Sequence, residues 1–115
     1  MQATDTNAVL DKSQLRDITM DDPELMREII AALLADTSQQ MALLEAAIRA
    51  QNTTQCIRLA HYSKGACANV GANRAAGMFK LIESKAAGGE FTECGESLAS
   101  LVLEMDLLRN ESAAL

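Results

Sequence analysis

The sequence contains one long stretch in which apolar residues recur at steps of three and four. It follows Asp22-Pro23-Glu24, which offers an N-cap side chain, a proline suited to the first helical position and a carboxylate that complements the helix dipole. The apolar stripe runs along this whole stretch and consists of Met26, Ile29, Ile30, Leu33, Leu34, Thr37, Met41, Leu44 and Ile48. So long a helix with one apolar side needs other helices to bury that side.

The composition favours helices elsewhere as well. Apolar residues make up 49% of the chain but aromatic residues only 3%, so the core must consist mainly of Leu, Ile, Ala and Met, which are helix formers. Runs of β-branched residues are scarce, and no segment alternates as a strand would. One proline and six glycines leave few points at which a helix can end, which favours a small number of long helices.

Further helices are predicted on both sides of this stretch. The apolar spacing of Leu10, Leu15 and Ile18 predicts a short first helix with Asp11 or Ser13 as its N-cap. Asn52-Thr53 closes the long helix and opens another over residues 54–70, after which a glycine can adopt the left-handed cap conformation.

Two more helices are expected in the second half of the chain. Asn73 is the predicted N-cap of the first, which Gly88-Gly89 stops; a close helix contact would explain Gly77 inside it. The second is expected over residues 91–109. The apolar side of this last helix is predicted to consist of Phe91, Cys94, Leu98, Leu101, Val102, Met105 and Leu108.

Short linkers make successive long helices antiparallel neighbours. The predicted fold is therefore all-α: an antiparallel up-down-up-down four-helix bundle with a short extra N-terminal helix. Residues 1–9 are expected to be a flexible N-terminal tail, and residues 10–115 are expected to form one helical bundle domain.

Charge and cysteine content restrict the partners. A formal charge of −6 and a pI near 4.6 disfavour nucleic acid and anionic membranes, and no window approaches eighteen uninterrupted apolar residues. The three cysteines, Cys56, Cys67 and Cys94, form no C-x-x-C pair, so they suggest small core residues rather than disulfides or a zinc site. We expect a cytoplasmic monomer without a metal of its own.

The only histidine of the chain, His61, lies in the helix expected over residues 54–70. At about 100° per residue, the side formed by Cys56, Leu59, Ser63, Ala66 and Val70 faces the core. His61 points away from that side, with Lys64 and Gly65 one turn later.

This placement allows two interpretations. An exposed imidazole is a nucleophile toward phosphorus, Lys64 can stabilise the phosphoryl oxygens, and Gly65 removes a side chain that would stand beside the ring. Alternatively, His61 and Lys64 are ordinary solvated surface residues, which is the usual role of a single exposed histidine. Spacing alone leaves both interpretations open.

The pattern H-x-x-K-G-x-x-x-x-x-G-A, formed by His61, Lys64, Gly65, Gly71 and Ala72, resembles the signature of histidine-containing phosphotransfer (HPt) domains. The resemblance implies a phosphorelay protein that accepts a phosphoryl group from an aspartyl phosphate on a receiver domain and passes it to another receiver. It also implies that the chain has no kinase activity of its own, so whether it counts as an enzyme stays open.

By this resemblance, His61 is phosphorylated, Lys64 is its electrostatic partner and Gly65 provides steric clearance. Receiver domains of response regulators or hybrid histidine kinases are the expected partners, and catalytic Mg²⁺ belongs to the receiver. Ile57, Arg58 and Ala68 are the expected docking residues, although scattered surface residues would look the same.

One position departs from the family pattern. The residue two after the histidine is usually Leu but is Ser63 here, and we expect its hydroxyl to bond the carbonyl oxygen of Leu59. Arg58 and Arg74 either help to hold phosphate or a partner, or are solvated surface residues.

Two alternatives from other functional classes stay open at this point. One is a non-phosphorylated helical adaptor that docks receivers or another partner through the same face. The other is an unrelated structural bundle.

Overall fold

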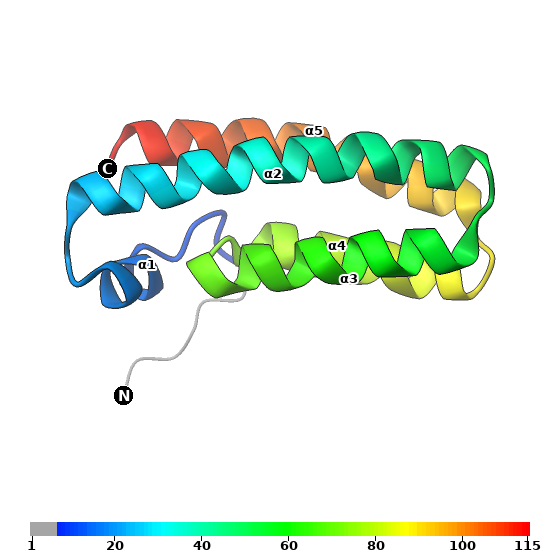
Figure 1. Cartoon of the computed structure of the whole chain (residues 1–115), viewed down its shortest axis with the longest axis horizontal. Coiled ribbons are helices and arrows are strands. Elements are labelled where there is room, and N and C mark those ends of the chain that lie inside the picture. The colour runs from blue at the N-terminus through cyan, green and yellow to red at the C-terminus, as the bar shows by residue number, and fades with distance from the viewer. Residues whose placement is uncertain (1–6) are drawn as a thin grey trace.

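The computed structural model describes residues 7–115 and places them in five helices and their connections (Figure 1). The helices are α1 (Lys12–Thr19), α2 (Pro23–Arg49), α3 (Thr53–Val70), α4 (Asn73–Ala87) and α5 (Phe91–Ala113). The described residues contain no strand, so the predicted all-α class is confirmed. Residues 1–6, which belong to the predicted tail, lie outside the described range.

The predicted N-caps of the first three helices are formed. Asp11, rather than Ser13, caps α1, and its side chain accepts a hydrogen bond from the amide of Gln14 at 3.1 Å. Asp22 caps α2 and accepts from two amides of the first turn, at 3.0 and 3.2 Å. Asn52 accepts from an amide of the first turn of α3 at 3.1 Å. These side chains fix where each helix begins because they satisfy amides that have no partner inside the helix.

The turn between α3 and α4 is held by the segment before α1. Gly71 ends α3 with a φ of +92°, and its carbonyl oxygen accepts from the amide of Asp11 at 2.8 Å. A Cβ at this position would lie 2.8 Å from the Asp11 carbonyl oxygen, so both the angle and the contact require glycine. The prediction that Asn73 caps α4 is wrong. Ala72 is the N-cap of α4, and the Asn73 side chain instead donates a hydrogen bond to Gln14 at 3.3 Å.

The core follows most of the predicted apolar faces. The largest fully buried apolar side chains are Phe79, Leu15, Ile30, Leu44, Ile82, Leu101 and Leu108. The predicted inward positions of Ile18 and Val102 are wrong, because these side chains are 48% and 53% exposed at the edges of their apolar stripes. Glu104, which no apolar pattern marks, is buried, and α5 continues past the predicted end at residue 109. The expected close contact at Gly77 is absent, because a Cβ there would have no heavy atom of the described chain within 4 Å outside its own helix backbone.

The four long helices form a ring of neighbours. Packing contacts join α2 with α3, α3 with α4, α4 with α5, and α5 with α2. In Figure 1, α2 and α5 form the upper pair and α3 and α4 the lower pair, and the chain turns back after each long helix. The short α1 packs against α2 and α3 at one end of the bundle.

The contacts of the chain with the bundle begin before α1. The Ala8 carbonyl oxygen accepts from the amide of Arg74 at 3.0 Å, Val9 is half-buried against the core, and Leu10 is buried. None of the helices in the described part of the chain is long and apolar enough to span a membrane.

Candidate functional site

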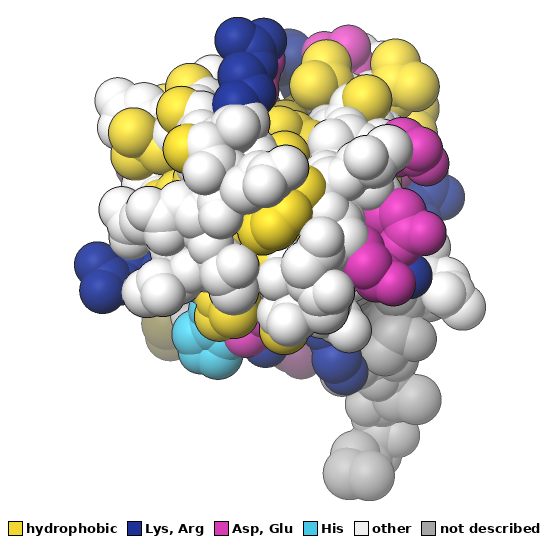
Figure 2. All heavy atoms as spheres, turned by 90° about the vertical axis from the view of Figure 1, so that its right-hand side faces the viewer, with side chains coloured by type: hydrophobic (Ala, Val, Ile, Leu, Met, Phe, Trp, Pro, Cys, Tyr) yellow, Lys and Arg dark blue, Asp and Glu magenta, His cyan; other side chains and the backbone are white. Residues whose placement is uncertain are grey.

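His61 stands on the outer side of α3, as its spacing predicts. The buried side of this helix consists of Cys56, Ala60, Ser63 and Cys67. The His61 side chain is 67% exposed, and Figure 2 shows the histidine at the lower edge of the molecular surface. The backbone at His61 is fixed because α3 packs against the core, whereas the imidazole ring is open to solvent.

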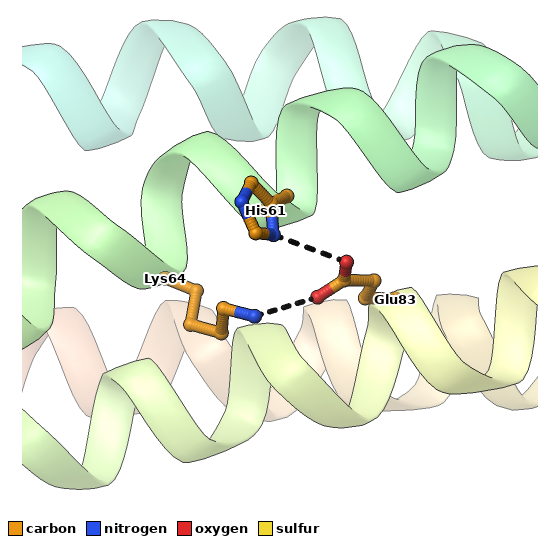
Figure 3. Close-up of polar contacts among 3 residues, drawn as sticks. All are labelled: His61, Lys64 and Glu83. Carbon is orange, nitrogen blue, oxygen red and sulfur yellow. Dashed lines mark hydrogen bonds and ion pairs between the residues drawn. The ribbon is translucent and has the colours of Figure 1, made fainter.

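A carboxylate from α4 contacts both His61 and Lys64 (Figure 3). Glu83 Oε2 lies 3.2 Å from His61 Nδ1, and Glu83 Oε1 accepts a hydrogen bond from Lys64 Nζ at 3.0 Å. The side chains of Lys64 and Glu83 are 29% and 25% exposed, so they lie along the seam between α3 and α4 while the imidazole stands outside it. We call these three residues the His61 cluster.

The Glu83 carboxyl group is held in its ionised form. Partial burial would by itself raise its pKa, but the hydrogen bond and charge of Lys64, together with His61, outweigh burial and lower the pKa below its ordinary value. An ionised carboxylate only accepts hydrogen bonds, so a bond between Glu83 and His61 requires the proton on Nδ1. The lone pair of a neutral imidazole then lies on Nε2.

Gly65 leaves the surface beside the imidazole bare. It is exposed, and a Cβ at this position would meet no heavy atom within 4 Å outside the backbone of its own helix. Packing within the described chain therefore does not require glycine here, although glycine in a helix costs about 1 kcal/mol relative to alanine. Gly77 and Gly95 are equally unconstrained, so what sets Gly65 apart is its place one turn after His61.

The three residues expected to dock a partner lie on the same helix but differ in exposure. Arg58 is exposed, whereas Ile57 and Ala68 are half-buried and pack against the core. The carbonyl oxygen of Ala68 also accepts a hydrogen bond from Gln14 Nε2 of α1 at 2.6 Å. This bond ties α1 to the last turns of α3.

Arg74 lies away from the His61 cluster, in an ion pair with α5. Its Nε donates to Glu104 Oε1 at 2.8 Å, and the Glu104 side chain is only 4% exposed. Its other oxygen, Oε2, is buried without a hydrogen-bond partner in the described chain. Arg74 therefore joins α4 to α5 in this structure.

Ser63 is buried on the core side of α3, but the expected hydrogen bond to Leu59 is not formed. Its Oγ has no hydrogen-bond partner among residues 7–115. An inward hydroxyl at this position removes apolar burial and adds an unpaired polar atom to the core.

The cysteines occupy the core as small residues. Cys56, Cys67 and Cys94 are buried thiols, and burial raises the pKa of Cys67 to about 12. Such a thiol is not a nucleophile at neutral pH. Residues 7–115 also contain no group of three His, Cys, Asp or Glu side chains arranged to hold a metal ion.

Sequence reasoning missed Glu83 as a member of the site. Its position was implicit in the predicted turn: His61 lies eleven residues before Ala72 and Glu83 eleven residues after it. Two antiparallel helices joined at that turn bring such residues to the same level. The contact between Tyr62 Oη and Asp36 of α2, at 2.9 Å, follows the same rule, because the two residues lie thirteen positions on either side of Arg49, where α2 ends.

Comparisons with known proteins identify the family and a similar fold. The family model described as the Hpt domain matches residues 28–111. The crystal structure of histidine-containing phosphotransfer protein B (HptB) from Pseudomonas aeruginosa PAO1 is similar in fold, with a TM-score of 0.83 and 23% identity over 92% of this chain and 92% of that chain. A comparison with curated protein sequences gave no significant match.

Proposed function

The chain belongs to the Hpt domain family, and we propose that His61 is the residue that carries its phosphoryl group. Members of this family are histidine phosphotransfer proteins of phosphorelays and interact with receiver domains. The observation that carries the assignment is that His61 is the only histidine of the sequence, and its ring is exposed with Nδ1 held by a carboxylate.

The proposed reaction begins with the Nε2 lone pair. It attacks the phosphorus of an aspartyl phosphate on the partner, the N–P bond forms, and the P–O bond to the aspartate breaks with its electron pair on the carboxylate oxygen. The imidazole becomes positive while Nδ1 keeps its proton, and the ionised Glu83 stabilises that charge. Glu83 acts as a positioning residue, because it sets which nitrogen is free to react.

Lys64 and Gly65 have supporting roles in this proposal. The Lys64 ammonium carries three donors and uses one on Glu83, so it can turn toward phosphoryl oxygens once Nε2 is phosphorylated. Gly65 lets the partner approach the ring, since no side chain rises beside it. A Gly65→Gln variant should keep its fold and transfer at least about tenfold more slowly, because a misplaced approach is costly in such reactions.

We further propose the finer features of the fold and of the partners. The helices form an antiparallel up-down-up-down bundle with α1 as the extra helix, and residues 10–115 make up the domain. Ile57, Arg58 and Ala68 contact a receiver domain of a response regulator or hybrid kinase, and that receiver holds Mg²⁺. The protein is a cytoplasmic monomer, consistent with three reduced thiols.

The test is transfer from purified receiver domains phosphorylated with acetyl phosphate. Wild-type protein should acquire an acid-labile, alkali-stable phosphoryl group, and His61→Gln should acquire none. A labelled His61→Gln variant would mean that another residue is the acceptor. A wild-type chain that binds a phosphorylated receiver without ever being labelled would instead be an adaptor.

A further inference from the structure

Positive charge is concentrated in the two helices that form the His61 cluster. Residues 53–87 contain five Lys or Arg and one Glu, a net charge of +4, although the whole chain carries −6. The rest of the chain therefore carries −10, which is −6 minus +4. In Figure 2, most acidic side chains in view lie on the right, whereas the histidine lies at the lower left.

Two of these five cations have no carboxylate of the described residues 7–115 beside them. The three that do are Lys64, Arg74 and Lys85. Arg58 and Lys80 are exposed and make no ion pair or side-chain hydrogen bond within residues 7–115. A paired cation is largely neutralised by its neighbour, so Arg58 and Lys80 contribute most to the field outside the surface.

These two cations flank the His61 cluster. Arg58 precedes His61 by one helical turn on α3, and Lys80 precedes Glu83 by one turn on α4. Because α3 and α4 run in opposite directions beside each other (Figure 1), one turn back along each helix leads away from the cluster in opposite directions, so the two positions lie toward opposite ends of it. Two positive charges near Lys64 that have no carboxylate partner within residues 7–115 favour an anionic surface on the partner.

We propose that Arg58 and Lys80 attract and orient the acidic surface that surrounds the phosphorylated aspartate of the partner. This inference rests on the proposed function, and it adds Lys80 of α4 to the docking surface. An aspartyl phosphate is anionic, and a Mg²⁺ site beside it is built from carboxylates, so such a surface is complementary to these two cations. The two cations act on association and leave the chemistry of Nε2 unchanged.

The test compares an Arg58→Gln/Lys80→Gln variant with wild type. The probe is a purified receiver domain, phosphorylated with acetyl phosphate, that transfers to wild type. At low ionic strength the second-order rate constant should fall at least about tenfold, and its dependence on salt should become shallower. The transfer rate at saturating receiver should change by less than about twofold, because charge pairs at the edge of an interface act mainly on association.

The matched control is Arg49→Gln/Arg109→Gln, which removes the same charge from paired residues on α2 and α5. We expect this control to change the rate constant by less than about twofold. If the Arg58/Lys80 variant behaves like wild type, or if the control loses as much, the inference is wrong. In either case wild type would still be labelled on His61, whereas failure of the proposed function would remove labelling at saturating receiver as well. Melting temperatures of all variants confirm that they are folded.

Discussion

Glu83 and Glu104 each accept a hydrogen bond from a cation of a neighbouring helix, but their surroundings differ. Glu83 is 25% exposed, and its two oxygens contact two different side chains of α3. Glu104 is 4% exposed, pairs with Arg74 through one oxygen and leaves the other unpaired within the described chain. One carboxylate lies at a seam that opens to water, and the other lies inside the bundle.

The difference decides what each ion pair can do. Water near Glu83 can replace a lost partner, so Lys64 can leave it for a phosphoryl group at little cost. Glu104 has no such replacement, and breaking its pair leaves a buried charge. The α3–α4 seam therefore suits a site whose contacts regroup during a reaction, and the α4–α5 seam suits holding two helices together.

The largest effect is expected from Arg74→Ala. This change leaves Glu104 buried without a cation, so we expect the free energy of unfolding to fall by about 2 kcal/mol, less than for a fully buried pair because Arg74 is itself half-exposed. Urea denaturation followed by circular dichroism measures the loss. Transfer to His61 in the folded fraction should be unchanged.

The control for Arg74→Ala replaces both partners. An Arg74→Met/Glu104→Met variant should recover most of the lost stability, because apolar residues can replace a buried ion pair. If the double variant is as unstable as Arg74→Ala, the loss comes from Arg74 packing and the buried charge is not its cause.

A smaller effect is expected from Lys64→Ala, and it is an effect on the transfer rate rather than on stability. Transfer from a phosphorylated receiver should slow about tenfold, which corresponds to about 1.4 kcal/mol of transition-state stabilisation. Stability should change by less than about 1 kcal/mol, because the pair with Glu83 is partly solvated. An unchanged transfer rate would remove the electrostatic role of Lys64 and weaken the contrast between the two seams.

Much of this structure follows from local sequence signals. Asp11, Asp22 and Asn52 cap helices where they were expected to, because a cap depends on residues within one turn. The exposure of His61 follows from helical phase in the same way.

What the sequence did not reveal depends on contacts between helices. Glu104 lies three residues after Leu101 and four before Leu108, at the edge of the apolar side, but a charged side chain predicts surface, and only the side of α4 that carries Arg74 makes burial possible. Asn73 was a reasonable cap by type, but Gln14 of α1 engages its side chain. Glu83 was within reach of prediction, since the turn near Ala72 sets the register of α3 against α4.

Ser63 offers a test of the buried side of α3. Like Glu104 Oε2, its Oγ is a buried polar atom that has no hydrogen-bond partner in the described chain. Ser63→Ala removes that hydroxyl without adding volume, so we expect stability to rise by about 1 kcal/mol. Thermal denaturation measures the change, and transfer should be unaffected.

The Leu found at this position in the family pattern provides the comparison variant. We predict that Ser63→Leu also raises the melting temperature, because it adds apolar burial. A gain for Ala with a loss for Leu would show that the core has no room for the larger side chain. A loss for both would contradict the view that the hydroxyl is unpaired.

The smallest effect concerns the pH dependence of the Glu83 contacts. The pKa of Glu83 in the folded protein lies below its ordinary value of 4.5, so the unfolded chain binds the proton more readily. The stabilisation by Lys64 and His61 is then fully present above that value and is lost as pH falls through the folded-state pKa. The free energy of unfolding of wild type should exceed that of Glu83→Gln by less than about 1 kcal/mol near neutral pH, and this difference should disappear in acid. Urea titrations of both proteins at several pH values measure it, and the other carboxyl groups, Glu93 among them, cancel because both proteins contain them. A difference that grows in acid would mean that burial, rather than the contacts with Lys64 and His61, dominates at Glu83.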